Sequence, residues 1–142
     1  MGGLTRVTLL LLLGAQVPGP EVLKTVIRRE GVDVEGAVFT GKDLRGAQFI
    51  SVRAPNAVLD GVDLRASQFT HVDLRRANLQ RTRGNGAVWT AVDLRSADLR
   101  DAQWEDLVCL GCRWDGARIN AGTVLPRDLP ASLRQRLLRV DP

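Results

Sequence analysis

The sequence predicts an all-β solenoid: a narrow, four-sided β-helix of about four and a half coils with a short helical cap at each end. Three observations predict it. Large apolar residues recur at every fifth position from residue 34 to residue 119, every Phe and Trp of the chain falls on that register, and small or β-branched residues recur two positions earlier. A period of five fits neither an α-helix nor a β-strand, but it fits a chain that turns a corner every five residues.

The large residues define the predicted core. Four sides of five residues close one coil of about 20 residues, so side chains about 20 positions apart are expected to stack. The positions expected to form this core are Phe39, Leu44, Phe49, Leu59, Leu64, Phe69, Leu74, Leu79, Trp89, Leu94, Leu99, Trp104, Cys109, Trp114 and Ile119. Phe49, Phe69 and Trp89 fall on one side and are expected to form a ladder of rings. Gly84 leaves a gap on another side, which the wide indole of Trp104 is expected to fill in part.

The repeat resembles that of the pentapeptide-repeat family, whose signature is Ala-(Asp/Asn)-Leu followed by two variable residues. Ala77–Leu79 and Ala97–Leu99 match this signature, and the resemblance extends over residues 34–120. The resemblance implies a right-handed quadrilateral β-helix over those residues.

The N-terminal region falls into two parts. Residues 1–19 hold Arg6, an apolar run at Val7–Leu13 and a Pro-Gly-Pro stretch. This order is typical of a secretory signal peptide, although the same residues could form a buried strand or helix at the cap. The run is too short to cross a bilayer, which takes roughly 20 apolar residues, so no transmembrane span is predicted. A cytoplasmic location is expected, with export through an N-terminal signal peptide as the alternative.

Each end of the solenoid needs a cap. Residues 20–33 are predicted to provide the N-terminal one, as a short helix over Pro20–Glu30 with its apolar residues on one face. Residues 121–142 form the tail, where a helix is expected over Pro126–Val140 with Asp128 as its N-cap. Its apolar stripe consists of Leu129, Leu133 and Leu137. That stripe would cover the last coil or join two chains into a homodimer.

Charge is spread along the repeats instead of clustered. The net charge is +4, but Asp and Arg alternate in the strings Val62–Arg65, Val72–Arg75 and Val92–Arg95, so the central region is nearly neutral. Nucleic-acid binding is therefore not predicted, since it needs a basic patch or stripe. The acids are interpreted as solvated partners of the arginines.

Cys109 and Cys112 form the one motif with metal or redox potential. In this register both side chains point into the core near one corner, and the chain has no second pair of cysteines. His71, the only histidine, lies about two coils away at an outward corner position. We therefore expect buried free thiols, with a disulfide as the alternative in an exported protein, and no metal or cofactor.

No constellation of residues predicts catalysis. A filled solenoid offers no cleft in which carboxylates could acquire shifted pKa values, and no glycine-rich phosphate loop follows a strand. One segment, Arg81–Gly86, breaks the inward pattern and contains the turn signal Asn-Gly. It is predicted to be a bulge or short protruding loop. The functional alternative is a partner-binding loop made by Arg81, Arg83, Gly84 and Asn85.

The sequence thus predicts a non-enzymatic interaction or scaffold module that presents the faces of its β-helix to an unidentified protein partner. The resemblance implies an alternative, because some pentapeptide-repeat proteins bind type II topoisomerases such as gyrase by imitating DNA and so give quinolone resistance. Such mimicry needs a strongly acidic rod of DNA-like length. The near-neutral body and the short rod of this chain disfavour that alternative.

Overall fold

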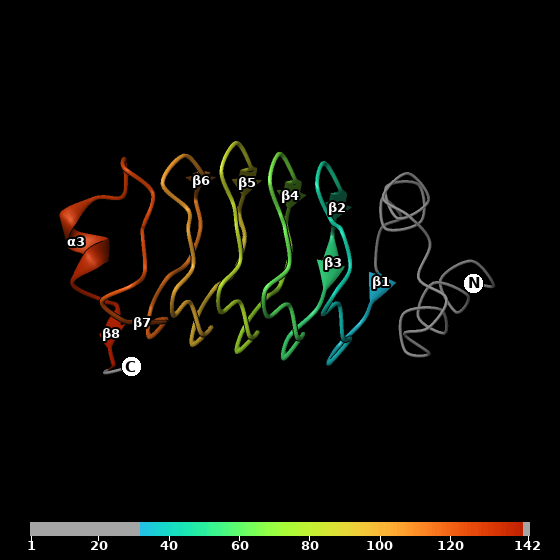
Figure 1. Cartoon of the computed structure of the whole chain (residues 1–142), viewed down its shortest axis with the longest axis horizontal. Coiled ribbons are helices and arrows are strands. Elements are labelled where there is room, and N and C mark those ends of the chain that lie inside the picture. Colours follow the sequence, from blue (N-terminus) through green and yellow to red (C-terminus); the bar gives the residue numbers. More distant parts are fainter. Residues whose placement is uncertain (1–31, 141–142) are drawn as a thin grey trace.

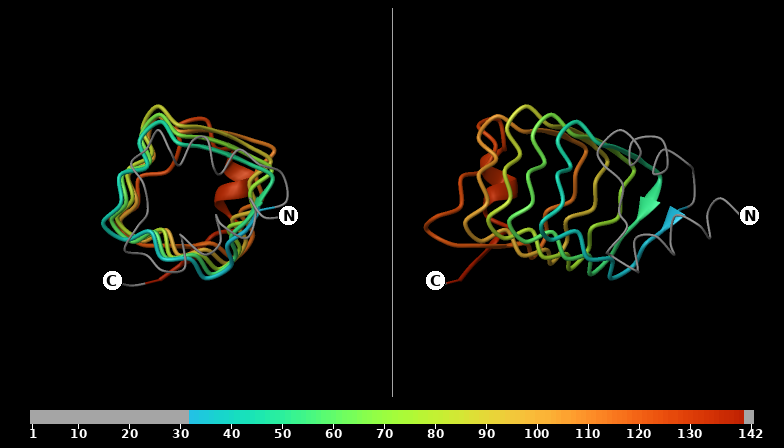
Figure 2. Two further views of the ribbon diagram at one scale, coloured as in Figure 1. Left: turned by 90° about the vertical axis from the view of Figure 1, so that its right-hand side faces the viewer. Right: turned by 45° about the vertical axis from the view of Figure 1, so that its right-hand side comes forward.

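The computed structural model describes residues 32–140, which wind into a β-helix of stacked coils (Figure 1). Viewed down the axis, the corners of successive coils superpose (Figure 2). All strand pairs are parallel and join residues 20 positions apart, as in the pair of Phe49 with Phe69. The predicted four-sided solenoid is confirmed.

The strands are short, because each side of a coil has room for only a few extended residues. They are β1 (Val32–Asp33), β2 (Gln48–Ile50), β3 (Val52–Arg53), β4 (Gln68–Thr70), β5 (Val88–Thr90), β6 (Val108–Leu110), β7 (Arg118–Ile119) and β8 (Leu138–Arg139). The largest sheet has the order β2-β4-β5-β6, and two smaller sheets pair β1 with β3 and β7 with β8. Single parallel bridges, such as that between Asp43 and Asp63, connect the coils elsewhere.

Hydrogen bonds between neighbouring coils satisfy the backbone. Phe39 N–H donates to Val58 O at 2.8 Å, and Val58 N–H donates to Ala37 O at 2.9 Å. The same alternation is repeated around each coil, so an interior coil is bonded to both of its neighbours. A coil at an end of the stack has only one such neighbour.

The predicted core positions lie inside the tube. All of them except Cys109 are at most 4% exposed, and the three tryptophans are among the largest fully buried side chains. The small residues two positions earlier, such as Ala47 and Val52, are buried as well. His71 lies exposed at a corner, where its backbone has a φ of 53°.

At the N-terminal side, the β-helix begins earlier than expected. Val32 and Asp33 were assigned to the N-terminal cap, but they form β1 and pair with Val52 and Arg53 of β3. The expected leader at residues 1–19 and the expected helix at Pro20–Glu30 lie outside the described residues.

The long C-terminal helix predicted over Pro126–Val140 is wrong. The helix α3 covers only Ala131–Arg134, follows Pro130, and receives no side-chain cap from Asp128. The chain then returns to the β-helix as β8, where Leu138 N–H donates to Ala117 O at 2.8 Å. The free edge of β7 offers the tail a hydrogen-bonding partner, and a continued helix would leave that edge open.

The leucine stripe of the tail faces the end of the solenoid. Leu129 and Leu137 are each 8% exposed, and Leu133 is partly buried against the same core. These three residues therefore pack on the last coil of their own chain.

One residue is inserted in the last coil. Gln103 pairs with Val124, 21 positions away, whereas the other pairs are 20 apart. Asn120 Oδ1 accepts hydrogen bonds from Asp101 N–H at 3.0 Å and from Gly122 N–H at 3.1 Å. These bonds hold the insertion at a corner, which preserves the stacking on either side.

Candidate interaction face

The four-stranded sheet differs from the other sides of the tube in its outward side chains. These belong to alternate residues of β2, β4, β5 and β6: Gln48, Ile50, Gln68, Thr70, Val88, Thr90, Val108 and Leu110. None of them is charged. We call the surface that they form the uncharged face.

The uncharged face becomes more apolar towards its C-terminal end. In the first coils Gln48 Nε2 donates to Gln68 Oε1 at 3.2 Å. In the last two strands Val88, Val108 and Leu110 are exposed by 45%, 42% and 58%. Clustered exposed apolar side chains on a soluble protein mark an interaction surface more often than isolated ones do.

The other three sides carry ion pairs. Each Asp-x-Arg string folds back on itself: Arg65 Nη2 lies 2.7 Å from Asp63 Oδ2, and Arg65 N–H also donates to Asp63 Oδ1 at 3.1 Å. The same arrangement occurs at Asp43 with Arg45, Asp73 with Arg75, Asp93 with Arg95 and Asp98 with Arg100. The hydrogen bonds from Arg45 lower the pKa of the Asp43 carboxyl to about 2. These walls therefore hold mutually neutralised charges.

A stack of rings lies directly behind the uncharged face. The ring centroids of Phe49 and Phe69 are 4.6 Å apart, and those of Phe69 and Trp89 are 4.5 Å apart with an interplanar angle of 4°. Trp104 meets Trp89 edge-on at 5.0 Å. Rotation of one ring would displace its neighbours, so this stack makes the sheet a rigid platform.

Two buried polar residues accept hydrogen bonds from the tryptophan indoles. They occupy the positions two residues before the large core residues, where small or β-branched residues otherwise recur. Trp89 Nε1 donates to Ser67 Oγ at 3.0 Å, and Trp104 Nε1 donates to Thr82 Oγ1 at 3.0 Å. Ser67 and Thr82 are fully buried. Each hydroxyl lies 22 positions before the indole that it binds. The two hydrogen bonds satisfy buried indole N–H groups that would otherwise be costly.

Cys109 and Cys112 form a disulfide, which corrects the expectation of buried free thiols. Their Cα atoms are 5.8 Å apart, on either side of the corner at Gly111, where φ is 65°. Both residues are only partly buried. β6 is the last strand of its sheet, so no further strand stacks on Cys109 to bury it.

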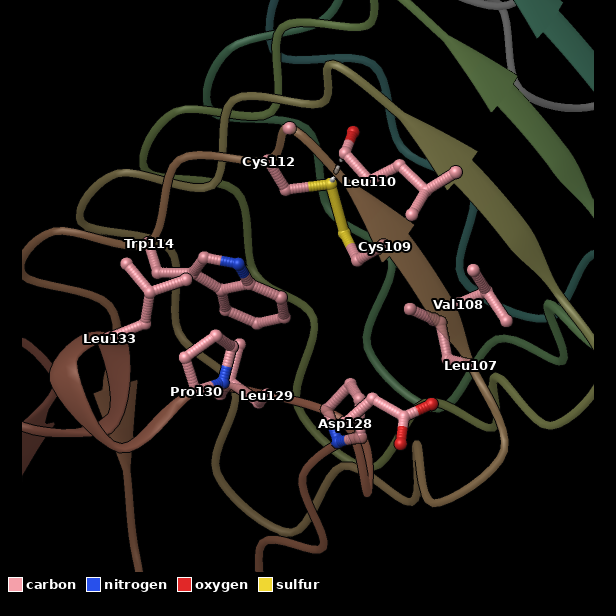
Figure 3. Close-up of a pocket in the computed structure, with 12 residues that line it drawn as sticks. Leu107, Val108, Cys109, Leu110, Cys112, Trp114, Asp128, Leu129, Pro130 and Leu133 are labelled. Atoms are coloured by element: carbon pink, nitrogen blue, oxygen red, sulfur yellow. Dashed lines mark hydrogen bonds between the residues drawn. A yellow bond between two sulfur atoms is a disulfide. The ribbon is translucent and has the colours of Figure 1, made fainter.

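A cavity of about 350 Å³ lies beside this disulfide. β6 and the disulfide form one wall, and the segment at Leu129–Leu133 forms the opposite wall (Figure 3). Trp114 lies between them. The lining is mainly apolar, with Asp128 at one end.

The family model for pentapeptide repeats matches residues 30–65, 43–81 and 73–103. These matches run without a gap from residue 30 to residue 103, which is just over half of the chain. The chain belongs to the pentapeptide-repeat family. The resemblance noted in the sequence is thereby confirmed.

The sequence and structure are similar to those of solved pentapeptide-repeat proteins, one of which shares the fold at a TM-score above 0.5. The protein Rfr23 from the cyanobacterium Cyanothece 51142 is 21% identical over 70% of this chain and 68% of its own, with a TM-score of 0.53. A protein from the Arabidopsis thaliana thylakoid lumen is 25% identical over 72% of both chains, with a TM-score of 0.43. QnrB1, a plasmid-mediated fluoroquinolone resistance protein, is 17% identical over 66% of this chain and 62% of its own, with a TM-score of 0.23. No curated protein matches the sequence.

The segment Arg81–Gly86 is neither a bulge nor a protruding loop, so the predicted protrusion is wrong. A partner-binding role for Arg81, Arg83, Gly84 and Asn85 stays a prediction, without the loop on which it was based. Arg83 pairs in register with Asp63 and Gln103, and the turn at Asn85 is an ordinary corner of this pentapeptide-repeat coil. Arg81 Nη2 reaches Asp60 Oδ1 at 2.6 Å. The pattern breaks at Gly84 because a Cβ there would lie 2.8 Å from Trp104 Cδ1. The glycine makes room for the indole.

The uncharged face and the cavity lie elsewhere than the candidate loop at Arg81–Gly86. The uncharged face could have been found in the sequence, as a lack of charge recurring every 20 residues. The cavity could not, since it depends on where the tail leaves the repeat. Within residues 32–140, no helix is long and apolar enough to span a membrane, and no group of three His, Cys, Asp or Glu residues is placed to hold a metal.

We expect the disulfide to stabilise the pentapeptide-repeat domain modestly. Replacing both cysteines, as Cys109→Ser with Cys112→Ser, should lower the free energy of unfolding by about 2 kcal/mol, because the bridge closes a very short loop. Urea unfolding followed by circular dichroism measures this. Dithiothreitol should reproduce the loss in the wild type and leave the double variant unchanged. A wild type whose stability does not respond to the reductant would contradict the prediction.

Proposed function

We propose that this pentapeptide-repeat protein is a non-enzymatic interaction module that binds another protein through its uncharged face. The observation that carries the proposal is the contrast between that face and the three ion-paired sides. Exposed Val88, Val108 and Leu110 lie together on the one side of the coils at residues 32–140 whose strands present no charged side chain.

Desolvation favours this side over the others. A partner that covers the Asp63–Arg65 or Asp98–Arg100 pair must remove water from both charges, and such a loss often exceeds the attraction that the pair provides. A partner that covers Val88 and Val108 removes water from apolar surface, which is favourable. The flat parallel sheet and its rigid ring stack also limit the entropy lost on binding.

The ion pairs do not support DNA mimicry. Imitating duplex DNA requires rows of uncompensated negative charge, whereas each of the five Asp-x-Arg carboxylates has an arginine at 2.6 to 2.8 Å. Asp60 and Asp115 also pair, with Arg81 and Arg136. A topoisomerase partner is therefore the weaker candidate.

Negative charges placed on the uncharged face should weaken binding strongly. Val88→Glu combined with Val108→Glu is compared with Val38→Glu, a matched control because Val38 is 51% exposed on a different side. Tagged proteins are used to capture partners from a lysate of the native cells, and the captured proteins are quantified by mass spectrometry. We expect a partner that the wild type and Val38→Glu retain equally and that the double variant captures at least about tenfold less.

All three proteins should unfold at similar denaturant concentrations, because substitutions at exposed positions usually change stability by less than about 0.5 kcal/mol. Two outcomes reject the proposal: every captured protein is retained by the double variant, or every protein that it loses is also lost by Val38→Glu.

A further inference from the structure

We propose that the C-terminal edge of β6 binds an extended peptide segment with a basic residue at its N-terminal end, which adds as a fifth strand to the four-stranded sheet and places an apolar side chain in the cavity beside Trp114. The inference rests on the proposed function only in that the ligand is a polypeptide. The binding surface is the edge of the sheet and not its face.

The edge of β6 has unused hydrogen-bonding groups. On this side His71 N–H donates to Thr90 O at 3.0 Å, and Ala91 N–H donates to Leu110 O at 2.8 Å. The equivalent donor one coil later is Gly111 N–H, and no group among the described residues accepts from it.

A comparison of successive coils also identifies an unused hydrogen-bond acceptor on β6. Val88 N–H donates to Ser67 O and Val108 N–H donates to Ala87 O, both at 2.9 Å. The equivalent acceptor is Leu107 O, which receives no hydrogen bond within the described part of the chain. Leu107 O and Gly111 N–H lie three peptide units apart, roughly 10 Å along an extended strand, and are groups with which a parallel strand would pair.

The chain leaves the ladder where a strand on β6 would lie. Arg127 N–H still bonds to Glu105 O at 3.2 Å, and the ladder resumes where Gly116 N–H donates to Arg136 O at 3.1 Å. Residues 128–135 make no backbone hydrogen bond to β6, since they bend outward into α3. One strand position in the stack is therefore empty.

The cavity occupies that empty position. Its volume of about 350 Å³ is sufficient for one or two apolar side chains. Figure 3 shows Leu107 and Val108 on the side of β6 and Leu129 and Leu133 across from them. The side chain at the centre of an added strand would point inward, into the column of Trp89 and Cys109.

Trp114 supplies a second unused donor. The other two indoles bind Ser67 and Thr82, but the residue 22 positions before Trp114 is Val92, which has no hydroxyl. Trp114 is 1% exposed and its Nε1 has no hydrogen-bond partner in residues 32–140. No fully enclosed side-chain nitrogen in those residues lacks a partner, so Trp114 Nε1 is not fully enclosed, and Trp114 lines the cavity. A buried N–H left in this way favours a ligand with a carbonyl group.

Charge orients the peptide. Asp128 stands at the end of the cavity near Leu107 and makes no ion pair with a described residue (Figure 3). A strand parallel to β6 would place its N-terminal residue beside Asp128. A lysine or arginine there complements the carboxylate, and the following apolar residue enters the cavity.

The test uses the blocked peptide acetyl-Lys-Thr-Leu-Thr-Val-amide, titrated into the ¹⁵N-labelled full chain and followed by NMR. We expect saturable shifts of the Gly111 amide and of the Trp114 indole N–H. The indoles of Trp89 and Trp104 should not shift, because they already donate to Ser67 and Thr82. These two signals are internal controls.

Two matched peptides separate the contributions. Methylation of the first threonine nitrogen removes the donor that faces Leu107 O, and should weaken binding about fivefold. A glutamate in place of the lysine should weaken it further beside Asp128. The variant Asp128→Asn should bind the lysine and glutamate peptides equally.

The proposal is overturned if neither the Gly111 nor the Trp114 signal shifts at millimolar peptide, or if the methylated peptide binds as well as the parent, which would mean that the cavity takes a side chain without a strand. A concentration-dependent dimer whose Gly111 amide is protected without peptide would also overturn it, since a second copy would then fill the edge. None of these outcomes decides the partner-capture result. Because Val108 lies on β6 and lines the cavity, Val88→Glu alone, on the strand before β6, tests the face without changing the edge.

Discussion

Trp89→Ala is expected to lower the free energy of unfolding by about 3 to 5 kcal/mol. The Trp89 side chain is fully buried, stacks on Phe69 at 4.5 Å and meets Trp104 edge-on at 5.0 Å. Its removal would leave a large void at the centre of the ring stack, because the short strands on either side are fixed by their hydrogen bonds and cannot close it. Equilibrium urea unfolding followed by far-UV circular dichroism measures the loss.

Two further variants divide that loss into its parts. Trp89→Phe keeps an aromatic ring in the stack but removes the hydrogen bond to Ser67 Oγ, and Ser67→Ala removes the same bond from the other side. Each should lower the free energy of unfolding by about 1 to 3 kcal/mol, since either leaves a buried polar group or a small void. Val38→Ala, at an exposed position, should change it by less than about 0.5 kcal/mol. A Trp89→Ala protein as stable as Val38→Ala would refute the buried ring stack.

Gly84→Ala should lower the free energy of unfolding by about 1 to 3 kcal/mol, although alanine is only one methyl group larger. A Cβ at this position would lie 2.8 Å from both Trp104 Cδ1 and Leu107 Cδ1. The backbone of Gly84 is not in the left-handed region, so the variant adds no backbone strain and its cost comes from lack of space. Thermal and urea unfolding of the variant provide the measurement.

Trp104 provides the control for this prediction. Trp104→Leu alone should be destabilising, because it removes a buried indole that fills the space above Gly84 and binds Thr82. In the Trp104→Leu background, however, Gly84→Ala should cost less than it does in the wild type, since the indole with which it collides is gone. Equal effects of Gly84→Ala in the two backgrounds would show that the clash with Trp104 is not the cause.

The sequence by itself determined the architecture of the repeats. The five-residue period gives large residues such as Phe49, Phe69 and Trp89 a shared interior, and stacking by 20 follows once a coil has the four sides that the family resemblance implies. The period also determined the composition of each side. The lack of charge on the outward residues of β2, β4, β5 and β6 is visible in the sequence once the period is known.

Only the tertiary structure decided what happens where the period is lost. Arg81–Gly86 looked irregular because Gly84 was considered apart from Trp104, its neighbour one coil later, whose indole needs the space. Likewise the spacing of Leu129, Leu133 and Leu137 matches the period of an α-helix when it is considered alone. The free edge of β7 draws the last of these residues back into the solenoid, and the helix is reduced to Ala131–Arg134.

The C-terminal end shows the physical reason for the difference. Inside the stack, each coil finds the same neighbours above and below, so the local pattern is sufficient to specify its contacts. At the end, the contacts of β6, the Cys109–Cys112 disulfide and Trp114 depend on the path of a tail that has no repeat. That path results from competition between helix formation, burial of leucines and pairing with an open strand edge. The outcome depends on contacts with residues far away in the sequence, so no local period predicts it.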